Sequence, residues 1–179
     1  MQKLLREDPQ GAAVALDDVQ RVIASEQRDF RFFIQELKPQ AGPRRTLQSR
    51  LTDLATRMER EWDLRVDVHL DLGDRAVPDG LARDVYLLVR EGLVNAVRHG
   101  GATVANVNLA RHVPDGLAVS IADNGRGFDF VGAYTADELT RLQIGPRTLC
   151  ERVLSLHGSL TLESGPAGAQ LQMVLPGAA

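Results

Sequence analysis

Cysteine is almost absent from the sequence, and Cys150 is the single example among 179 residues. One cysteine cannot form an internal disulfide, and no second cysteine stands at the spacing of a metal site. We therefore interpret Cys150 as a buried residue of a helix in a reducing compartment. This interpretation favours a cytoplasmic location, whether a longer parent protein is soluble or membrane-anchored.

Long apolar runs and clusters of basic residues are also lacking. No stretch approaches the roughly 20 consecutive apolar residues of a membrane-spanning helix, so we expect no direct membrane contact by this chain. The net charge is −3, and aromatic residues make up 4% of the chain. Since no group of Lys and Arg alternates with aromatic residues, we expect no nucleic-acid partner.

The composition is that of one or two small folded domains, with 44% hydrophobic and 25% charged residues. Residues 14–38 carry apolar side chains at alternating three- and four-residue steps, which is coiled-coil spacing. The seam comprises Leu16, Val19, Ile23, Phe30, Phe33 and Leu37, with Glu26 as its polar member. Because such a seam requires a partner surface, it predicts a homodimer through this helix; packing on its own domain is the alternative.

Prolines and glycines between residues 38 and 45 interrupt this pattern and predict a hinge. A second helix is predicted next, with an apolar face made of Leu47, Leu51, Leu54 and Met58. We therefore divide the chain into a segment with the seam helix over 1–38, a hinge and first helix over 39–64, and a domain over 65–179.

Apolar residues recur at either the helical spacing or every second residue along 65–179, and these two patterns predict the helices and strands of this domain. Helices are predicted at 80–99 and 147–157, and strands at 64–72, 104–110, 117–123, 159–164 and 170–176. The segment 129–146 has no clear period and is predicted to be irregular. This order of elements predicts an α+β two-layer sandwich, in which helices cover one face of a mixed sheet.

The predicted helix 80–99 has a polar face. Glu91 and Asn95 lie four residues apart on this face, and Arg98 and His99 follow one turn later. The opposite, apolar face comprises Val85, Leu88, Val89 and Ala96. An Asn amide oxygen beside a carboxylate suits magnesium, which usually shares its ligands with substrate phosphates. A solvated helix face is the alternative interpretation.

A short glycine-containing segment, Asp123-Asn-Gly-Arg-Gly127, follows the predicted strand 117–123 directly. A hairpin turn is the simplest interpretation, but no matching strand is predicted after Phe128. Two glycines two residues apart permit close backbone approach, and a carboxylate at a strand end can accept a hydrogen bond from a buried amino group. These features suit the recognition of adenine.

At these segments the sequence resembles a known superfamily. Residues 91–99, EGLVNAVRH, resemble the asparagine box of the gyrase, heat-shock chaperone, histidine kinase and mismatch-repair ATPases. Residues 123–128, DNGRGF, resemble their first glycine-rich box. Residues 149–176 and the segment QRDFRFFIQELKP resemble sensor histidine kinases that pair with helix-turn-helix response regulators. The resemblance implies a Bergerat-type ATPase fold preceded by a dimerisation helix.

The resemblance also implies roles for individual residues. Glu91 and Asn95 would be the catalytic residues, Asn95 as the magnesium ligand, and Asp123 would accept a hydrogen bond from the adenine amino group. Residues 129–146 would form a lid over the triphosphate. The nucleotide-binding residues expected in this way are Asn95, Arg98, His99, Asp123, Gly125, Gly127, Gly145 and Arg147.

The sequence departs from the family pattern in the second glycine-rich box. Gly145 is the one glycine of three that is present, and Gln143 and Thr148 occupy the other positions. Backbone amides that would hold phosphate are therefore less free to do so. We expect a phosphate-binding site that is weakened or altered in shape, to which Arg147 could contribute a positive charge.

The phosphoacceptor histidine of the family is absent as well. The four histidines are His69, His99, His112 and His157, and none lies on the seam helix. We interpret His69 as a solvent-facing strand residue and His112 and His157 as surface residues, the former in a loop. The chain therefore resembles a fragment that begins after the accepting histidine.

The function implied is that of the ATP-binding catalytic fragment of a sensor histidine kinase. The parent protein would transfer the γ-phosphoryl group of magnesium-bound ATP to a histidine outside this chain, and then to a cognate response regulator. The first alternative is a degenerate, non-catalytic kinase-like module that dimerises and relays a signal, which the altered glycine box favours. The second is an anti-sigma-factor serine kinase, against which the coiled-coil helix argues.

Overall fold

The structure is a computed structural model, and it describes residues 46–73, 76–112 and 116–177. All of these residues belong to the second of two compact units, Arg44–Ala179. The seam predicted over 14–38 and the hinge predicted over 38–45 lie outside the described residues. The division at residues 38 and 64 therefore stays a prediction.

The strands form one mixed sheet of six, in the order β1-β2-β3-β6-β5-β4. Their bounds are β1 Arg65–Asp71, β2 Val104–His112, β3 Gly116–Asp123, β4 Gly132–Thr135, β5 Ser159–Gly165 and β6 Gly168–Leu175. Strands β1 and β2 run parallel, and the remaining neighbours are antiparallel. A parallel pair requires a long crossover connection, and the helix α4, Asp79–Arg98, provides it.

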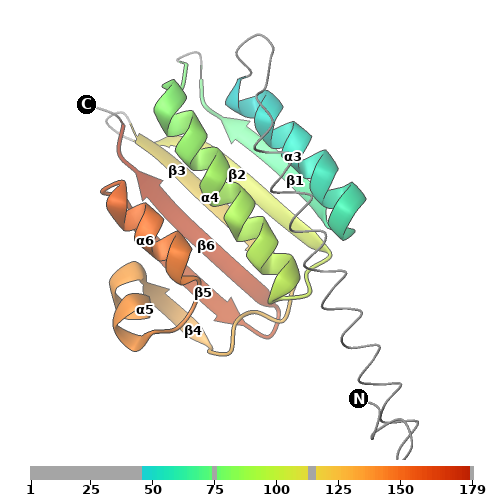
Figure 1. Cartoon of the computed structure of the whole chain (residues 1–179), viewed down its shortest axis with the longest axis vertical. Helices are drawn as coiled ribbons and strands as arrows, with labels where there is room; N and C mark the ends of the chain where they lie inside the picture. Colours follow the sequence, from blue (N-terminus) through green and yellow to red (C-terminus); the bar gives the residue numbers. More distant parts are fainter. Residues whose placement is uncertain (1–45, 74–75, 113–115, 178–179) are drawn as a thin grey trace, which may run out of the picture. The chain divides into compact units, whose positions relative to one another are not determined.

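The helices of the described residues are α3 Leu47–Trp62, α4 Asp79–Arg98, α5 Ala136–Leu142 and α6 Arg147–Ser155. Helices α3, α4 and α6 lie next to one another over one face of the sheet, and α5 packs on β4 and β5 (Figure 1). The predicted α+β two-layer sandwich is confirmed. None of the helices in the described part of the chain combines the length and apolar character that crossing a bilayer requires.

The core lies between the sheet and its helices. In β2, Ala105, Val107 and Leu109 are buried, and the intervening Asn106 and Asn108 are exposed. Helix α4 buries the whole apolar face predicted for it, including Val85, Leu88, Val89 and Ala96. Burying one large apolar side chain contributes roughly 1.5–3 kcal/mol. This packing therefore fixes α4 against the sheet and determines where its polar face points.

Helix α3 forms as the sequence predicts. Thr46 caps its first turn, since the hydroxyl accepts a hydrogen bond from the Ser49 N–H at 3.2 Å. All four apolar residues predicted to share one face are buried, together with Trp62. The helix packs against β1 and α4, so it is an integral part of the described domain.

The prediction of an irregular segment over 129–146 is wrong. Strand β4 pairs with β5, and α5 begins with a reciprocal cap in which Thr135 and Glu138 bond each other's backbone N–H. These elements are four and seven residues long, too short to show a hydrophobic period. The rings of Phe128 and Phe130 also stack with centroids 5.6 Å apart, and Tyr134 meets Phe130 edge to face with centroids 5.3 Å apart. This segment is therefore regular in structure, and its role as a lid over the triphosphate stays a prediction.

Candidate nucleotide-binding site

The sheet topology brings the two motif segments together. Helix α4 ends at Arg98, and a short turn leads into β2. Because β3 runs antiparallel to β2, Asp123 at the end of β3 pairs with Ala105 near the start of β2. Segments about 25 residues apart in the chain therefore meet beside one end of the β2–β3 pair, where the start of one strand lies next to the end of its antiparallel neighbour.

Hydrogen bonds join the two segments directly. The Arg126 backbone N–H donates to the Gly100 carbonyl, and the Arg126 Nε donates to the His99 carbonyl, each at 2.9 Å. Strand β4 pairs with β5 instead of β3, which confirms that residues 123–127 are not a hairpin turn. The glycine segment is thus a loop anchored to the C-terminal end of α4.

Asp123 is half-buried at the end of β3. The Gly125 N–H donates to its Oδ1 at 2.8 Å. Burial raises the pKa of the Asp123 carboxyl, and the backbone N–H groups of Gly125 and Ala169 oppose that increase. A carboxylate offers about four acceptor positions. Asp123 can therefore hold its own loop and still accept a hydrogen bond from a ligand amino group.

The two glycines of the loop are required by close packing. A Cβ on Gly127, whose φ is +71°, would lie 2.5 Å from the Gly165 carbonyl oxygen. A Cβ on Gly125 would lie 2.8 Å from the Gly100 carbonyl oxygen. Real Cβ atoms do not approach this closely, so side chains at these positions would displace the loop from its neighbours.

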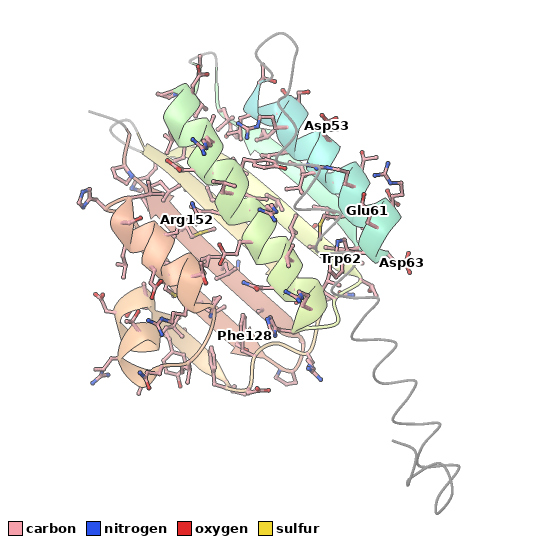
Figure 2. All side chains as sticks on the ribbon, in the orientation of Figure 1. Asp53, Glu61, Trp62, Asp63, Phe128 and Arg152 are labelled. Carbon is pink, nitrogen blue, oxygen red and sulfur yellow. The ribbon has the colours of Figure 1, made fainter. Side chains whose placement is uncertain are left out.

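The polar face of α4 points away from the core, as predicted. Asn95 is half-buried, and Arg98 and His99 are exposed. Glu91 lies one turn before Asn95, and its Oε2 is 4.0 Å from the Arg152 Nε of α6. Figure 2 shows Arg152 on the side of α6 that faces α4. Burial raises the pKa of the Glu91 carboxyl, and Arg152 and Arg90 oppose that increase.

The donor set suits a magnesium ion that arrives with a nucleotide. No cluster of three or more His, Cys, Asp or Glu side chains within the described ranges could hold a metal ion. Magnesium, however, is usually held by one or two protein oxygens together with substrate phosphates. The Asn95 amide oxygen, with the Glu91 carboxylate on the same helix face, fits that requirement.

The second glycine-rich box has two residues in left-handed backbone conformations, which glycine adopts most readily. Gln143 ends α5 in the left-handed conformation, at φ 55° and ψ 38°, and Gly145 has φ +77°. Helix α6 starts at Arg147 after Pro146, without a side-chain cap on its first N–H groups. The Arg147 side chain is exposed, and its Nε pairs with the Glu151 Oε1 of its own helix at 2.7 Å. A phosphate contact by Arg147 or Gly145 therefore stays a prediction.

The remaining histidines and the cysteine have the predicted environments. His69, His112 and His157 are exposed, although His112 is the last residue of β2 and not part of a loop. Cys150 is 1% exposed in α6, as expected. Burial and the nearby Glu91 carboxylate raise the pKa of its thiol to about 11, so it is not a nucleophile at neutral pH.

Sequence reasoning missed several residues that shape the loop. The buried Ser164 hydroxyl accepts a hydrogen bond from the Phe128 N–H at 2.8 Å. A Cβ on Gly168 would lie 1.9 Å from the Asp123 carbonyl oxygen. Both residues belong to the β5–β6 hairpin, whose contact with the loop depends on the pairing of β3 with β6. No local sequence pattern indicates such a contact. Asn124 also contacts residues outside the loop, and the sequence could have indicated it as a candidate because it lies inside the first glycine-rich box.

The fold is similar to that of solved ATP-binding domains of histidine kinases. The ATP-binding domain of PrrB from Mycobacterium tuberculosis superposes with a TM-score of 0.51 at 26% identity, covering 75% of this chain and 96% of that one. The histidine kinase domain of the blue-light-activated kinase of Erythrobacter litoralis gives a TM-score of 0.55 at 23% identity, covering 76% and 66%. The predicted fold is therefore confirmed by solved structures.

Sequence comparison points to the same class of protein. The sensor protein VraS of Staphylococcus haemolyticus and that of Staphylococcus aureus are each 24% identical over 159 residues, which cover 88% of this chain. No protein-family model matches the chain. The predicted resemblance to sensor histidine kinases is confirmed, and the chain spans 43% of the length of these relatives.

Proposed function

We propose that this chain is the ATP-binding catalytic part of a sensor histidine kinase. In the whole protein it would direct the γ-phosphoryl group of ATP to a histidine outside this chain, and from there to a cognate response regulator. The observation that carries the proposal is the anchoring of the Asp123–Gly127 loop to the C-terminal end of α4, the helix whose polar face carries Glu91 and Asn95. Relatedness to sensor proteins supports the same reaction class.

Different residues of the site would bind the adenine and the phosphates of the nucleotide. Asp123 would accept a hydrogen bond from the adenine amino group, which selects adenine over guanine. Asn95 would hold a magnesium ion, which supplies charge neutralisation for the phosphates when bound. Glu91 would orient groups around the transferred phosphoryl, and Arg98 and His99 would supply positive charge and donors nearby.

The proposal includes the parts of the chain outside the described residues. Residues 1–38 would form a homodimer by their coiled-coil seam, and the hinge at 38–45 would let the catalytic domain approach the accepting histidine. The chemistry of such a transfer depends on positioning and charge neutralisation. A hinge that changes the separation of domains would therefore control the reaction.

The altered second glycine box was the basis for the alternative of a degenerate module. Gln143 nevertheless adopts the left-handed backbone conformation that a glycine would favour. The backbone at this position therefore has a conformation that a glycine would adopt readily. This observation favours a working nucleotide site over a degenerate one.

Calorimetric titration of the chain with magnesium and a non-hydrolysable ATP analogue tests the proposal. We expect micromolar binding that Asn95→Ala weakens by about tenfold or more, equivalent to roughly 1.4 kcal/mol. The matched control is Asn108→Ala, because Asn108 lies on the exposed face of β2 and donates to Ser120 at 3.3 Å. This control should bind like the parent chain.

Two results would contradict the proposal. A folded chain that binds no nucleotide would support the degenerate signalling module. Binding that Asn95→Ala leaves unchanged, or that Asn108→Ala weakens equally, would remove Asn95 from the site. Omitting magnesium should weaken binding to the parent chain far more than to the Asn95→Ala variant.

A further inference from the structure

Asn124 makes an unusual set of side-chain hydrogen bonds across the site. Its Oδ1 accepts from the backbone N–H groups of Thr103 and Val104, each at 2.9 Å. Its Nδ2 donates to the Thr103 hydroxyl at 3.1 Å, and its backbone N–H donates to the Val104 carbonyl at 3.1 Å. The side chain therefore uses three of its four hydrogen-bonding positions within the protein, and it spans from the glycine loop to the start of β2.

The segment that Asn124 holds is the connection between α4 and β2. This turn directly follows Arg98 and His99, the residues expected near the phosphates. Asn124 itself directly follows Asp123, the residue expected at the adenine. The Asn124 side chain thus ties the residue after Asp123 to the end of the turn that follows Arg98 and His99, and the Arg126 Nε bond to the His99 carbonyl ties the loop to the start of that turn.

We propose that Asn124 is a positioning residue that fixes the separation between the adenine end and the phosphate end of the site. The inference rests on the proposed ATP-binding function and goes beyond it, because Asn124 touches neither end of the ligand. Thr103 and Val104 already engage both acceptor positions and one of the two donor positions of its amide, which leaves one N–H for any other partner. Without Asn124, each end would keep its own residues but lose the correct spacing.

The test compares a ligand that occupies one end with a ligand that spans both. Adenosine probes the adenine end, and magnesium with a non-hydrolysable ATP analogue probes the whole site. In Asn124→Ala we expect the Kd of the analogue to rise about tenfold or more, and that of adenosine to rise less than about threefold. A positioning role predicts this split, because only the ligand that bridges both ends depends on their separation.

Two milder variants keep the test decisive if Asn124→Ala does not fold. Asn124→Asp retains the oxygen that accepts from Thr103 and Val104, and the Thr103 hydroxyl can donate to it, so the ratio of the two Kd values should return towards the parent value. Thr103→Val removes only the bond from Nδ2 and should change the ratio by about two- to threefold. Thermal melting of every variant reports how much fold stability is lost.

The outcomes separate this inference from the proposed function. If the parent chain binds neither ligand, the proposed function fails. If the parent chain binds both ligands but Asn124→Ala weakens them by the same factor, the residue acts through general stability or direct base contact, and the inference is overturned. An unchanged ratio in all three variants also overturns it.

Discussion

Replacing Asp123 with Asn separates the binding role of this carboxylate from its structural role. An Asn oxygen can still accept the Gly125 N–H bond, which is 2.8 Å long in the parent protein. The negative charge is lost, however, and an amide nitrogen stands where an acceptor is needed. We therefore expect the loop to keep its conformation and adenine recognition to fail.

The size of the effect follows from the loss of one charge-assisted hydrogen bond. Such bonds contribute about 1.5–3 kcal/mol, so the Kd of an ATP analogue should rise from about tenfold to about a hundredfold. Stability should not fall with it. Since burial raises the pKa of Asp123, ionisation of this carboxyl costs the folded state some stability. Asp123→Asn removes that penalty, so at pH 7 the variant should melt no lower than the parent chain.

The pH dependence provides the sharper test. The penalty on the charged form exists above the raised pKa and disappears as the pH falls through it. The affinity advantage of the parent chain over Asp123→Asn should therefore shrink in the same acidic range. Calorimetric titrations of both proteins at several pH values measure this ratio, in which protonation of the nucleotide phosphates cancels. A ratio that is constant with pH, or a variant that loses affinity because it unfolds, would refute the reasoning.

Two further predictions concern backbone conformation. Gln143 occupies the left-handed region at φ 55°, which costs a non-glycine residue roughly 1–2 kcal/mol. Glycine would relieve this strain but would also add entropy to the unfolded chain, which offsets part of the gain. We therefore expect Gln143→Gly to raise the free energy of unfolding by up to about 1 kcal/mol and Gln143→Val to lower it by about 1 kcal/mol. Equal melting temperatures would contradict this. Gly168→Ala should destabilise by about 2 kcal/mol or more, because its Cβ would meet the Asp123 carbonyl oxygen, and should weaken nucleotide binding. Gly80→Ala is the control, since nothing lies within 4 Å of its added Cβ, and chemical unfolding in urea compares the two.

The long elements could be predicted from the sequence because each buries one face. Helix α4 was expected over 80–99 and lies at Asp79–Arg98, since its apolar residues recur at the helical period over five turns. Strand β1 alternates regularly and is where it was expected. Strand β4 and helix α5 gave no such signal, because β4 is only four residues long and α5 buries only Ala136 and Leu139.

The site was predictable to the extent that it lies within continuous motifs. Asp123 and Asn95 each stand in a short pattern whose chemistry can be interpreted locally. Ser164, Gly168 and Arg152 act on those motifs from elements far along the chain, and their positions follow from the pairing of β6 with β3 and the packing of α6 on α4. Only the folded structure reveals these contacts, because a single sequence contains no record of which elements become neighbours.

The Glu91–Arg152 pair relates this packing to function. Glu91 lies on the polar face of α4, yet α6 covers it enough that burial dominates its pKa shift. The 4.0 Å separation from Arg152 is too long for a hydrogen bond, so the pair offsets only part of the desolvation cost. Glu91 therefore lies beside Asn95 and against the helix that follows Gly145, at a cost in stability that its ion pair only partly offsets. Perturbed carboxylates of this kind are often found at functional sites, which is consistent with the role proposed for Glu91.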